Sequence, residues 1–513
     1  MPEDVIFDEM ISLWVKKYSE RTAVIDKDGS KYLYRELRYM TDKFAGYFHK
    51  VGVHRGDKVI VQMNNSAVLI FTVTGLFRLG AVPIMVLPAY RENELDGIIV
   101  KSEARFYISQ EENNGDNLIS LAKKLTERCS SIQKLIFEST LFDVLESDKE
   151  YPLDESAERP VPSDLALLLL SGGTTSIPKL IPRTHKDYIY NNKKAAEKIS
   201  LNENDVYLAF MPIVHNFTLG APGIFGTFYV GGTVVVSNSI GALELLEEMD
   251  EYDVTFTSMV PSLLRILLDT LEIDDSLYPE SLRMILIGGS MLEPSLAQRA
   301  DEMLDGALVQ VFGTAEGLIC MTDPDDDISV KAYVQGKPIS EYDEIRIVDE
   351  NYNDLPAGET GQLITRGPHT IHSYYGADKS KDSFTPDGFY CTGDKARITK
   401  DGNIQILGRT KEQINRMGEK IMPVDIEELA VKNELISECA VIGVPNEVKG
   451  MEIVAFIVAK EKLTKEEVNG FLKEKGLAVY KLPDKVINIP VMPLTAFSKP
   501  DKKKLLKMHG NLN

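Results

Sequence analysis

Short apolar runs alternate with helical patterns through about the first 300 residues, and this alternation limits the possible folds more than any other feature. Each run has the length and composition of a buried strand. Strands that alternate with helices are typical of α/β architecture with largely parallel sheets. We therefore predict a body built on two α/β sheets, with strands at Lys58–Met63, Ala81–Leu87, Ala166–Leu170, Thr233–Val236 and Met284–Ile287.

From about residue 340 the pattern changes to short strands separated by turn signals. Glu344–Val348, Gly361–Thr365 and Ile404–Leu407 are such strands, and Asp401-Gly402 stands between Ala396–Ile398 and the last of them. Asp-Gly between two strand-like runs is a strong hairpin signal. The sequence thus predicts a small β subdomain after the two larger sheets.

A second boundary is expected after Gly408-Arg409, because 513 residues are too many for one ordinary core. The pattern beyond it predicts a compact α+β domain. Its expected elements are helices at Val424–Lys432 and Lys465–Lys475, and strands at Cys439–Val444, Ile453–Ala459 and Lys485–Ile489. We predict an N-terminal body over residues 1–409 and a small C-terminal domain over residues 410–513.

Charge and composition exclude several classes of protein. The formal net charge of −21 argues against a general nucleic-acid surface, which needs clustered Lys and Arg. The apolar stretch Ala67–Leu87 contains Arg78, Gly80 and Pro83, so it favours a buried helix followed by a strand over a membrane span. The acidic start lacks the basic residues of a signal peptide, and the scattered cysteines suit a reducing cytosol. We expect a cytoplasmic protein with no nucleic-acid or membrane partner; the cysteines are Cys129, Cys320, Cys391 and Cys439.

The strand at Ala166–Leu170 runs directly into the loop Ser171–Lys179, which is rich in glycine and hydroxyl side chains. Glycine lets backbone N–H groups turn inward at low steric cost. Inward N–H groups, hydroxyls and the Lys179 charge together suit a polyphosphate. The loop lacks the Gly-Lys-Ser/Thr ending of a Walker A loop, and surface turns often have this composition. Taken alone, it is equally compatible with a phosphate cradle and with a plain turn.

Several separated motifs then occur in a fixed order. The chain resembles the superfamily of acyl- and aryl-adenylating enzymes over roughly residues 20 to 509, and within it the stand-alone aryl-acid–AMP ligases of siderophore pathways, such as 2,3-dihydroxybenzoate–AMP ligases. The motifs that carry the resemblance are Ser171–Lys179, Gly288-Gly289-Ser290, Phe312–Gly317, Tyr390–Asp394, Gly408-Arg409 and Pro493–Lys499.

The resemblance implies a complete ATP site. Glu316 would hold Mg²⁺, since a hard divalent ion that bridges phosphates prefers a carboxylate. Thr314 would contact the α-phosphate, and Asp394 would bind the ribose, where a carboxylate can accept from both hydroxyls. Arg409 would support the same ribose or the phosphate. The β- and γ-phosphates would contact Ser171, Gly172, Thr174, Thr175 and Lys179. The adenine would pack on Gly288, Gly289 and Ser290.

The resemblance also implies a C-terminal domain that is mobile and rotates between two reaction steps. Lys499 would be the catalytic lysine of the first step, in which a carboxylate attacks the α-phosphorus of ATP. The hinge would lie at Lys411, although an ordinary surface lysine is equally compatible with that position. Gly418 would line the tunnel for a phosphopantetheine arm in the second step.

The segment His215–Gly223 lies where this family lines its acid pocket. Amino-acid-activating relatives place an Asp at the Asn216 position, so the neutral Asn216 predicts an acid without an amine, such as an ortho-hydroxy aryl acid. Ala221 stands where 2,3-dihydroxybenzoate ligases carry Ser, and this favours an acid without the 3-hydroxyl, such as salicylate. Ile319 and Gly289 would wall the ring, and His215 would be an aromatic gate or else a packed core histidine.

The sequence therefore predicts an ATP- and Mg²⁺-dependent enzyme that activates an aryl acid as its acyl adenylate. The aryl group would then pass to a phosphopantetheinylated aryl or acyl carrier protein in siderophore or nonribosomal peptide biosynthesis. An acyl- or aryl-CoA ligase and a fatty-acid-activating enzyme share every nucleotide motif and remain alternatives. A non-catalytic ligand-binding homologue is a further alternative, although it would not need to keep Lys499.

Overall fold

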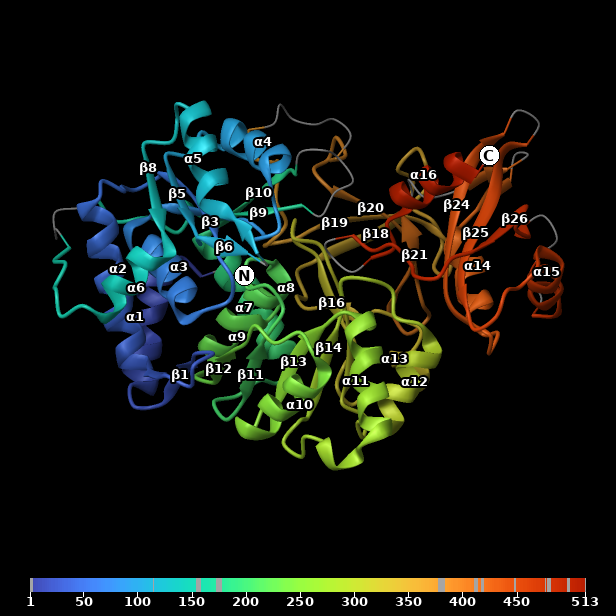
Figure 1. The fold of residues 1–513 in the computed structure, drawn as a ribbon, viewed down its shortest axis with the longest axis horizontal. Coiled ribbons are helices and arrows are strands. Elements are labelled where there is room, and N and C mark those ends of the chain that lie inside the picture. Colours follow the sequence, from blue (N-terminus) through green and yellow to red (C-terminus); the bar gives the residue numbers. More distant parts are fainter. Residues whose placement is uncertain are drawn as a thin grey trace.

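The computed structural model describes residues 3–512 apart from 114, 154–157, 172–177, 377–382, 410–413, 417–418, 447–448, 476, 478–480 and 496–498. Within these residues the N-terminal body contains two large sheets and a smaller one, and the C-terminal part forms a separate α+β unit at one end of the molecule (Figure 1). This is the predicted fold class. The domain boundary at 409/410 stays a prediction, because residues 410–413 lie outside the described part.

The first large sheet has the strand order β10-β9-β4-β3-β5-β8. All neighbouring strands are parallel except β9 and β10, which form an antiparallel pair. The three strands of this sheet that the sequence predicts, at β3, β4 and β9, agree with the observed strands to within two residues at each end. The strands are β3 (Lys58–Gln62), β4 (Val82–Met85), β5 (Phe106–Ser109), β8 (Lys134–Phe137), β9 (Leu165–Leu170) and β10 (Leu180–Thr184).

The second large sheet has the order β17-β16-β15-β14-β13-β11-β12-β1-β2, with a parallel centre and antiparallel pairs at both edges. The strands are β1 (Thr22–Ile25), β2 (Lys31–Leu33), β11 (Val206–Ala209), β12 (Thr233–Val236), β13 (Phe256–Met259), β14 (Met284–Ile287), β15 (Leu308–Gly313), β16 (Ile319–Met321) and β17 (Lys337–Pro338). Two further short strands, β6 (Glu112–Asn113) and β7 (Asp116–Asn117), form a hairpin of their own.

Helices lie between and around these sheets (Figure 1). They are α1 (Phe7–Tyr18), α2 (Tyr34–Lys50), α3 (Ala67–Leu79), α4 (Glu92–Ser102), α5 (Leu118–Arg128), α6 (Glu138–Glu146), α7 (His185–Lys198), α8 (Asn216–Gly220), α9 (Gly223–Val230), α10 (Ala242–Glu251), α11 (Pro261–Ile273), α12 (Pro294–Met303) and α13 (Ile328–Lys331). The largest core cluster takes side chains from both sheets and from α3, α7 and α9, so these helices join the two sheets into one body.

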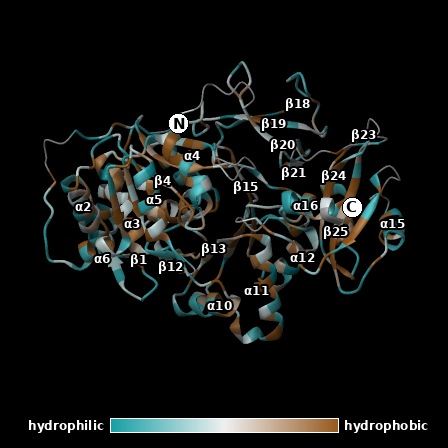
Figure 2. Cartoon of the chain, turned by 45° about the horizontal axis from the view of Figure 1, so that its top comes forward, coloured by the Kyte–Doolittle hydropathy of each residue, from teal (hydrophilic) through white to brown (hydrophobic). Residues whose placement is uncertain are grey.

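Helix α3 is the apolar stretch that resembles a membrane span in composition, and Figure 2 shows it as hydrophobic. Ser66 caps its first turn by accepting from the Leu69 N–H, and Gly80 ends it in the left-handed conformation at φ +67°. Its residues other than Arg78 are buried against the rest of the body. None of the helices in the described part of the chain is both long and apolar enough to cross a bilayer.

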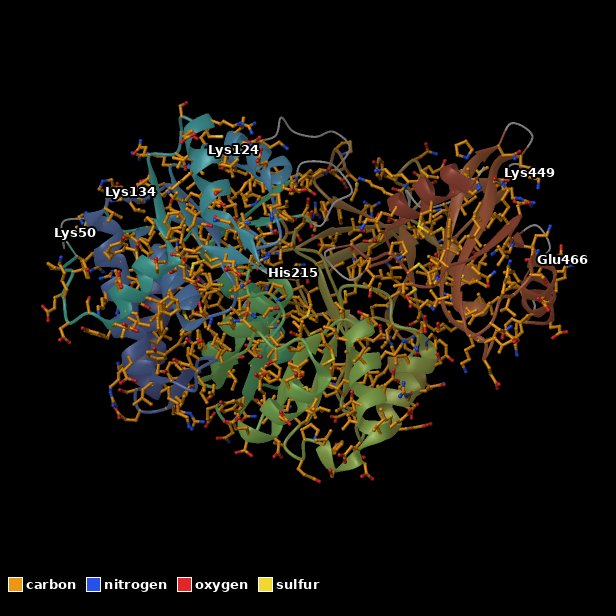
Figure 3. The ribbon with its side chains drawn as sticks, in the orientation of Figure 1. Lys50, Lys124, Lys134, His215, Lys449 and Glu466 are labelled. Atoms are coloured by element: carbon orange, nitrogen blue, oxygen red, sulfur yellow. The ribbon has the colours of Figure 1, made fainter. Side chains whose placement is uncertain are left out.

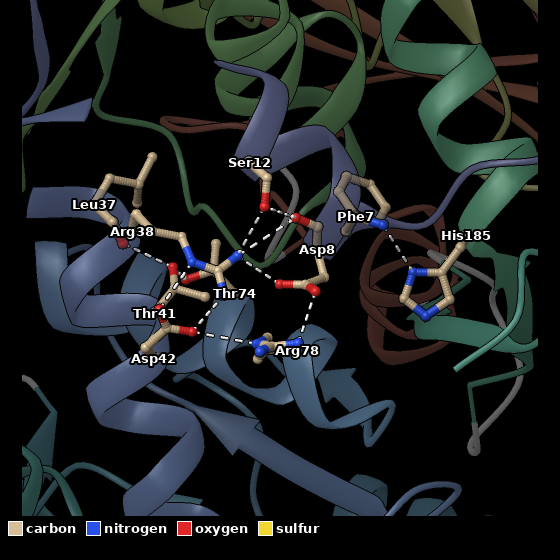
Figure 4. A network of polar contacts seen from close by, with 10 residues as sticks. All are labelled: Phe7, Asp8, Ser12, Leu37, Arg38, Thr41, Asp42, Thr74, Arg78 and His185. Carbon is tan, nitrogen blue, oxygen red and sulfur yellow. Dashed lines mark hydrogen bonds and ion pairs between the residues drawn. The ribbon is translucent and has the colours of Figure 1, made fainter. Parts of the chain in front are cut away.

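A buried charge network fixes α1 to the two helices that follow it (Figure 4). Asp8 of α1 lies between Arg38 of α2 and Arg78 of α3, with N–O distances of 2.6 and 2.7 Å. Asp42 contacts both arginines as well. The buried Asp8 carboxylate is thus paired with two guanidinium groups, which offsets the desolvation of its charge, while Asp42 is partly exposed.

The predicted β subdomain is a four-stranded antiparallel sheet of β18 (Glu344–Val348), β19 (Gly361–Arg366), β20 (Tyr390–Ile398) and β21 (Ile404–Arg409). Asp401-Gly402 makes the turn between the last two strands, with Gly402 at φ +80°, as its hairpin signal predicts. The C-terminal unit has its own apolar core. Its elements are β22 (Ile414–Arg416), β23 (Glu419–Ile421), α14 (Pro423–Ala430), β24 (Ile436–Asn446), β25 (Gly450–Ala459), α15 (Lys465–Glu474), β26 (Lys485–Asn488) and α16 (Lys502–Leu512).

Candidate functional site

The candidate site lies where the two large sheets approach each other. Figure 3 shows His215 near the middle of the molecule, between the N-terminal sheet and the helices that follow it. A small cavity of about 20 Å³ opens beside it. The lining comes from the end of β4 and the loop after it, the end of β9, the start of α8 and the turn after β15: Met85, Leu87, Tyr90, Leu169, Leu170, Val214, His215, Asn216 and Ala315.

Asn216 begins α8, and a neighbouring helix holds its side chain. Its Oδ1 accepts a hydrogen bond of 2.9 Å from the hydroxyl of Tyr188 on α7. Asn216 is 8% exposed, and it lines the cavity. The predicted acid-binding residue therefore reaches the site as a neutral, partnered amide, and not as a counter-charge.

His215 precedes α8 and is neutral at physiological pH. Its Nδ1 accepts from the N–H of Phe217 at 3.2 Å, so the neutral ring carries its proton on Nε2. Burial and, to a smaller extent, the Lys499 ammonium together lower the pKa of His215 to about 4. The Lys499 charge therefore acts on a residue of the site, and the catalytic role predicted for Lys499 stays a prediction.

The remaining predicted acid-pocket residues lie on α8, β14 and β16 or directly after these elements. Ala221 follows α8 and is buried, and Ile319 on β16 pairs with Gly313 across the β15–β16 ladder. A Cβ on Gly288 would come within 3.1 Å of the Phe217 ring, so this glycine allows α8 to approach β14. Gly289 has φ +79°, and Ser290 follows in a bend, which is the close-approach turn that the sequence predicts.

The two ends of the phosphate loop are tied together. The Ser171 N–H donates to the Lys179 carbonyl, and the Lys179 N–H donates to Ser171 Oγ, both at 3.0 Å. Residues Gly172, Thr174 and Thr175 lie outside the described part of the chain, so their predicted phosphate contacts stay predictions.

Lys179, Tyr374 and Glu316 form a charged cluster beside the loop. The Lys179 Nζ lies 4.3 Å from the centroid of the Tyr374 ring and donates to Ser383 Oγ at 3.2 Å. The Tyr374 hydroxyl donates to Glu316 Oε1 at 2.8 Å. Glu316 is 8% exposed and sits in the tight turn between β15 and β16, so it is not a solvated glutamate at a helix start.

A buried hydroxyl in the same turn has no partner among the described residues. Thr314 Oγ1 is buried without a hydrogen-bond partner, while its backbone N–H donates to the Leu318 carbonyl at 2.9 Å. An unsatisfied buried hydroxyl costs about 1–3 kcal/mol, so such atoms usually have a role. Together with the Glu316 carboxylate, it fits an Mg²⁺–phosphate group, whose oxygens would accept from the hydroxyl.

The ribose pair is brought together by strand register. Asp394 on β20 and Arg409 on β21 are direct antiparallel partners, and Asp394 is 3% exposed. The side chain of Arg409 lies outside the described part, as do Lys411 and Gly418. The predicted roles of Lys411 at the hinge and Gly418 in the thiol tunnel therefore stay predictions.

Comparison with known proteins identifies the family. A family model described as "AMP-binding enzyme" matches residues 11–375, and one described as "AMP-binding enzyme C-terminal domain" matches residues 425–499. The chain belongs to the AMP-binding enzyme family. The predicted resemblance to adenylate-forming enzymes is thereby confirmed.

Individual relatives of this AMP-binding enzyme extend over nearly the whole chain. The 2,3-dihydroxybenzoate-AMP ligase of Bacillus subtilis is 37% identical and covers 97% of this chain and 93% of the relative. The salicyl-AMP ligase / salicyl-S-ArCP synthetase of Mycobacterium tuberculosis is 34% identical, with 98% and 90% covered. The apo structure of Mycobacterium smegmatis MbtA superposes with a TM-score of 0.75 at 34% identity, with 99% and 95% covered.

Two tyrosines of the site are absent from the sequence-based prediction. Tyr374 holds the glutamate assigned to the metal, and Tyr188 holds the asparagine assigned to the acid. Neither stands inside a motif with a recognisable chemical pattern, so the sequence carries no signal for them beyond a buried aromatic residue. Their roles depend on which side chain each hydroxyl meets in the folded enzyme.

Proposed function

We propose that this enzyme activates an ortho-hydroxylated aryl acid of the salicylate class as its acyl adenylate, with release of pyrophosphate. The aryl group then passes to the phosphopantetheine thiol of an aryl carrier protein. The observation that carries the proposal is the neutral Asn216 in the cavity beside His215, where an acid with an α-ammonium would find no counter-charge. The names of the relatives, which include dihydroxybenzoate and salicyl ligases, support the same class.

The first step needs no general base, because the substrate carboxylate is already the nucleophile. A carboxylate oxygen forms a bond to the α-phosphorus, and the bond from that phosphorus to the pyrophosphate oxygen breaks. The difficulty is the approach of two anions. Lys499, whose charge helps to lower the pKa of His215, would stabilise both anions as they meet. The neutral His215 adds no positive charge of its own.

Glu316 and the hydroxyl of Thr314 would hold the Mg²⁺–phosphate group, and Lys179 would hold the outer phosphates. When bound, Mg²⁺ supplies positive charge to the phosphate oxygens. The Tyr374 hydroxyl orients the Glu316 carboxylate for this role. We place Asp394 and Arg409 on the ribose, Gly288 to Ser290 on the adenine, and Ala221 and Ile319 against the aryl ring.

The second step requires a thiol to attack the mixed anhydride and AMP to leave. We propose that the C-terminal domain turns about Lys411, which removes Lys499 from the site and brings Gly418 to it. Because the reaction consumes ATP and serves a biosynthetic carrier, we place the enzyme in the cytoplasm.

ATP–pyrophosphate exchange across a panel of acids tests the proposal. The panel contains salicylate, benzoate, 2,3- and 4-hydroxylated benzoates, fatty acids and amino acids. We expect the highest kcat/KM with salicylate, because Ala221 gives no hydroxyl partner to a 3-hydroxyl group. Exchange with amino acids or fatty acids alone would overturn the aryl-acid assignment.

The acceptor is tested separately with the preformed adenylate. We expect transfer to a phosphopantetheinylated aryl carrier protein and little transfer to free coenzyme A. Efficient transfer to coenzyme A alone would make the protein an aryl-CoA ligase instead.

A further inference from the structure

Helix α7 supports the acid-binding helix α8 through a set of buried polar contacts. The Tyr188 hydroxyl donates to Asn216 Oδ1 at 2.9 Å at the start of α8, and Asn191 Nδ2 donates to the Gly220 carbonyl at 2.5 Å at its end. A Cβ on Gly220 would overlap Tyr188 Oη and Asn192 Oδ1. The two helices are therefore in contact at both ends of α8, and the contact leaves no room for a side chain at Gly220.

Tyr188 is itself fixed in place. It has no exposed surface, its ring centroid lies 6.2 Å from that of Phe7 and 6.3 Å from that of Phe225, and the Arg183 guanidinium carbon lies 5.0 Å from its centroid. Burial raises the pKa of the Tyr188 phenol well above its usual value, so the hydroxyl keeps its proton at neutral pH. The phenol is thus a hydrogen-bond donor in a fixed position.

A fixed donor decides which end of the Asn216 amide meets the substrate. An amide oxygen only accepts hydrogen bonds and its nitrogen only donates. The oxygen is turned toward Tyr188, and the Asn216 Nδ2 has no protein partner in the described part of the chain. If the amide turned over, the phenol proton would lose its acceptor inside the core, which costs about 1–3 kcal/mol.

We infer that Tyr188 is a positioning residue that keeps Asn216 as a hydrogen-bond donor toward the acid pocket. The site then selects an aryl acid that offers an acceptor beside its carboxylate, such as an ortho-hydroxyl oxygen, over one that offers an ortho-amino donor. This inference rests on the proposed function and names the residue that sets its selectivity.

The Tyr188→Phe variant tests the inference, because Phe keeps the ring packing and removes only the donor. ATP–pyrophosphate exchange is measured with salicylate and with anthranilate, which differ in the ortho group. We expect the KM for salicylate to rise about 10-fold while the kcat and the KM for ATP stay within about 2-fold. The ratio of kcat/KM for salicylate to that for anthranilate should fall by about 10-fold.

Tyr34→Phe is the matched control. Tyr34 is also fully buried, and its hydroxyl donates to the Gly232 carbonyl at 2.7 Å in a different part of the body. Its loss should lower the thermal unfolding midpoint about as much as Tyr188→Phe does, and it should leave the salicylate-to-anthranilate ratio unchanged. An equal fall of the ratio in both variants would assign the effect to general loosening of the core and reject the inference.

A double-mutant cycle with Asn216→Ala shows whether Tyr188 acts through the amide. On the Asn216→Ala background, Tyr188→Phe should change the ratio by less than about 2-fold. An undiminished effect there, or an unchanged ratio in Tyr188→Phe alone, overturns the inference. These failures differ from failure of the proposed function, in which the unmodified enzyme itself shows no exchange with any aryl acid.

Discussion

The acid side and the phosphate side of the site are built in different ways. On the acid side, the Asn216 amide is held by a neutral phenol from a helix inside the core, and His215 beside it is uncharged. On the phosphate side, the cation Lys179 lies over the ring of Tyr374, and the anion Glu316 accepts a hydrogen bond from the hydroxyl of the same residue. We therefore expect the acid side to select its ligand with fixed neutral groups and the phosphate side to depend on charges.

This difference follows from what each ligand brings. A substrate acid carries one charge, and its selection rests on hydrogen bonds whose direction must be set in advance. ATP carries several charges. Its phosphates can replace the Tyr374 ring and the Ser383 hydroxyl as partners of Lys179. We expect changes on the acid side to alter which acid is used, and changes on the phosphate side to alter how tightly ATP and Mg²⁺ are used.

The largest effect is expected where both sides meet. Lys499→Ala removes the cation that helps to lower the pKa of His215, and it should lower the rate of adenylate formation by about 10²–10³. Thiol transfer from supplied acyl-AMP should be spared, and pyrophosphate exchange and transfer assays measure the two steps separately. Lys504→Ala, which removes a 63% exposed lysine of the same segment, is the control. Equal loss of both steps in Lys499→Ala would refute the assignment.

A charge placed on the acid side should have the next largest effect. Asn216→Asp puts a carboxylate near that of the substrate, and two such charges about 6 Å apart repel by about 3 kcal/mol at an effective dielectric constant of about 20. We expect aryl-acid exchange to fall by about 100-fold, while the KM for ATP changes little. The Tyr188 hydroxyl can still donate to the Asp, so the fold is kept. Near-normal exchange would mean that residue 216 does not face the acid.

Loss of one hydroxyl on the phosphate side should have a moderate effect. Tyr374→Phe removes the donor to Glu316, a hydrogen bond to a charged group worth about 1.5–3 kcal/mol. The Mg²⁺ concentration that gives half-maximal exchange should rise about 10-fold, with the choice among aryl acids unchanged. Tyr375→Phe serves as the control, since the Tyr375 ring contacts Lys58 instead. A changed preference among aryl acids in Tyr374→Phe would contradict the expectation that the phosphate side does not influence the choice of acid.

The smallest effect concerns the protonation of His215. Its pKa of about 4 leaves the ring neutral at pH 7, and both burial and Lys499 act in this direction. Lys499→Ala should therefore raise the pKa of His215, and Lys504→Ala should not. An NMR titration of the histidine signals, assigned with a His215→Gln variant, measures the shift. An unchanged pKa in Lys499→Ala would place Lys499 away from the site.

The low pKa of His215 also makes the folded protein less stable as the pH falls. The folded His215 binds fewer protons than the unfolded chain between pH 6.5 and about 4, so its contribution to stability is present above pH 6.5 and is lost as the pH falls toward 4. His185, whose pKa burial also lowers to about 4, adds to this loss. His185→Asn keeps an acceptor for the Phe7 N–H and should make the unfolding midpoint less dependent on pH over this range.

Much of the fold was predictable from local pattern. The alternation of strands and helices gave the α/β body, and the Asp401-Gly402 turn gave the hairpin of the β subdomain, because periodicity and turn chemistry depend on neighbouring residues. The antiparallel edges of the second large sheet were not predicted, because the edge strands β2, β16 and β17 have only two or three residues each, too few for a clear periodic pattern. Family membership also followed from the sequence, because the order of the motifs is itself a property of the sequence.

The sequence by itself determined which chemical groups are available: a carboxylate at Glu316, a lysine at Lys499 and a neutral amide at Asn216. Only the tertiary structure decided how they are oriented. A hydrogen bond has a direction and a short range, so the Tyr188 hydroxyl can set the Asn216 amide only where α7 packs on α8. The Lys179–Tyr374–Glu316 cluster likewise joins three segments that are distant in the chain. If the inference about Tyr188 holds, the acid that the site accepts depends on helix packing as well as on the residues that line the pocket.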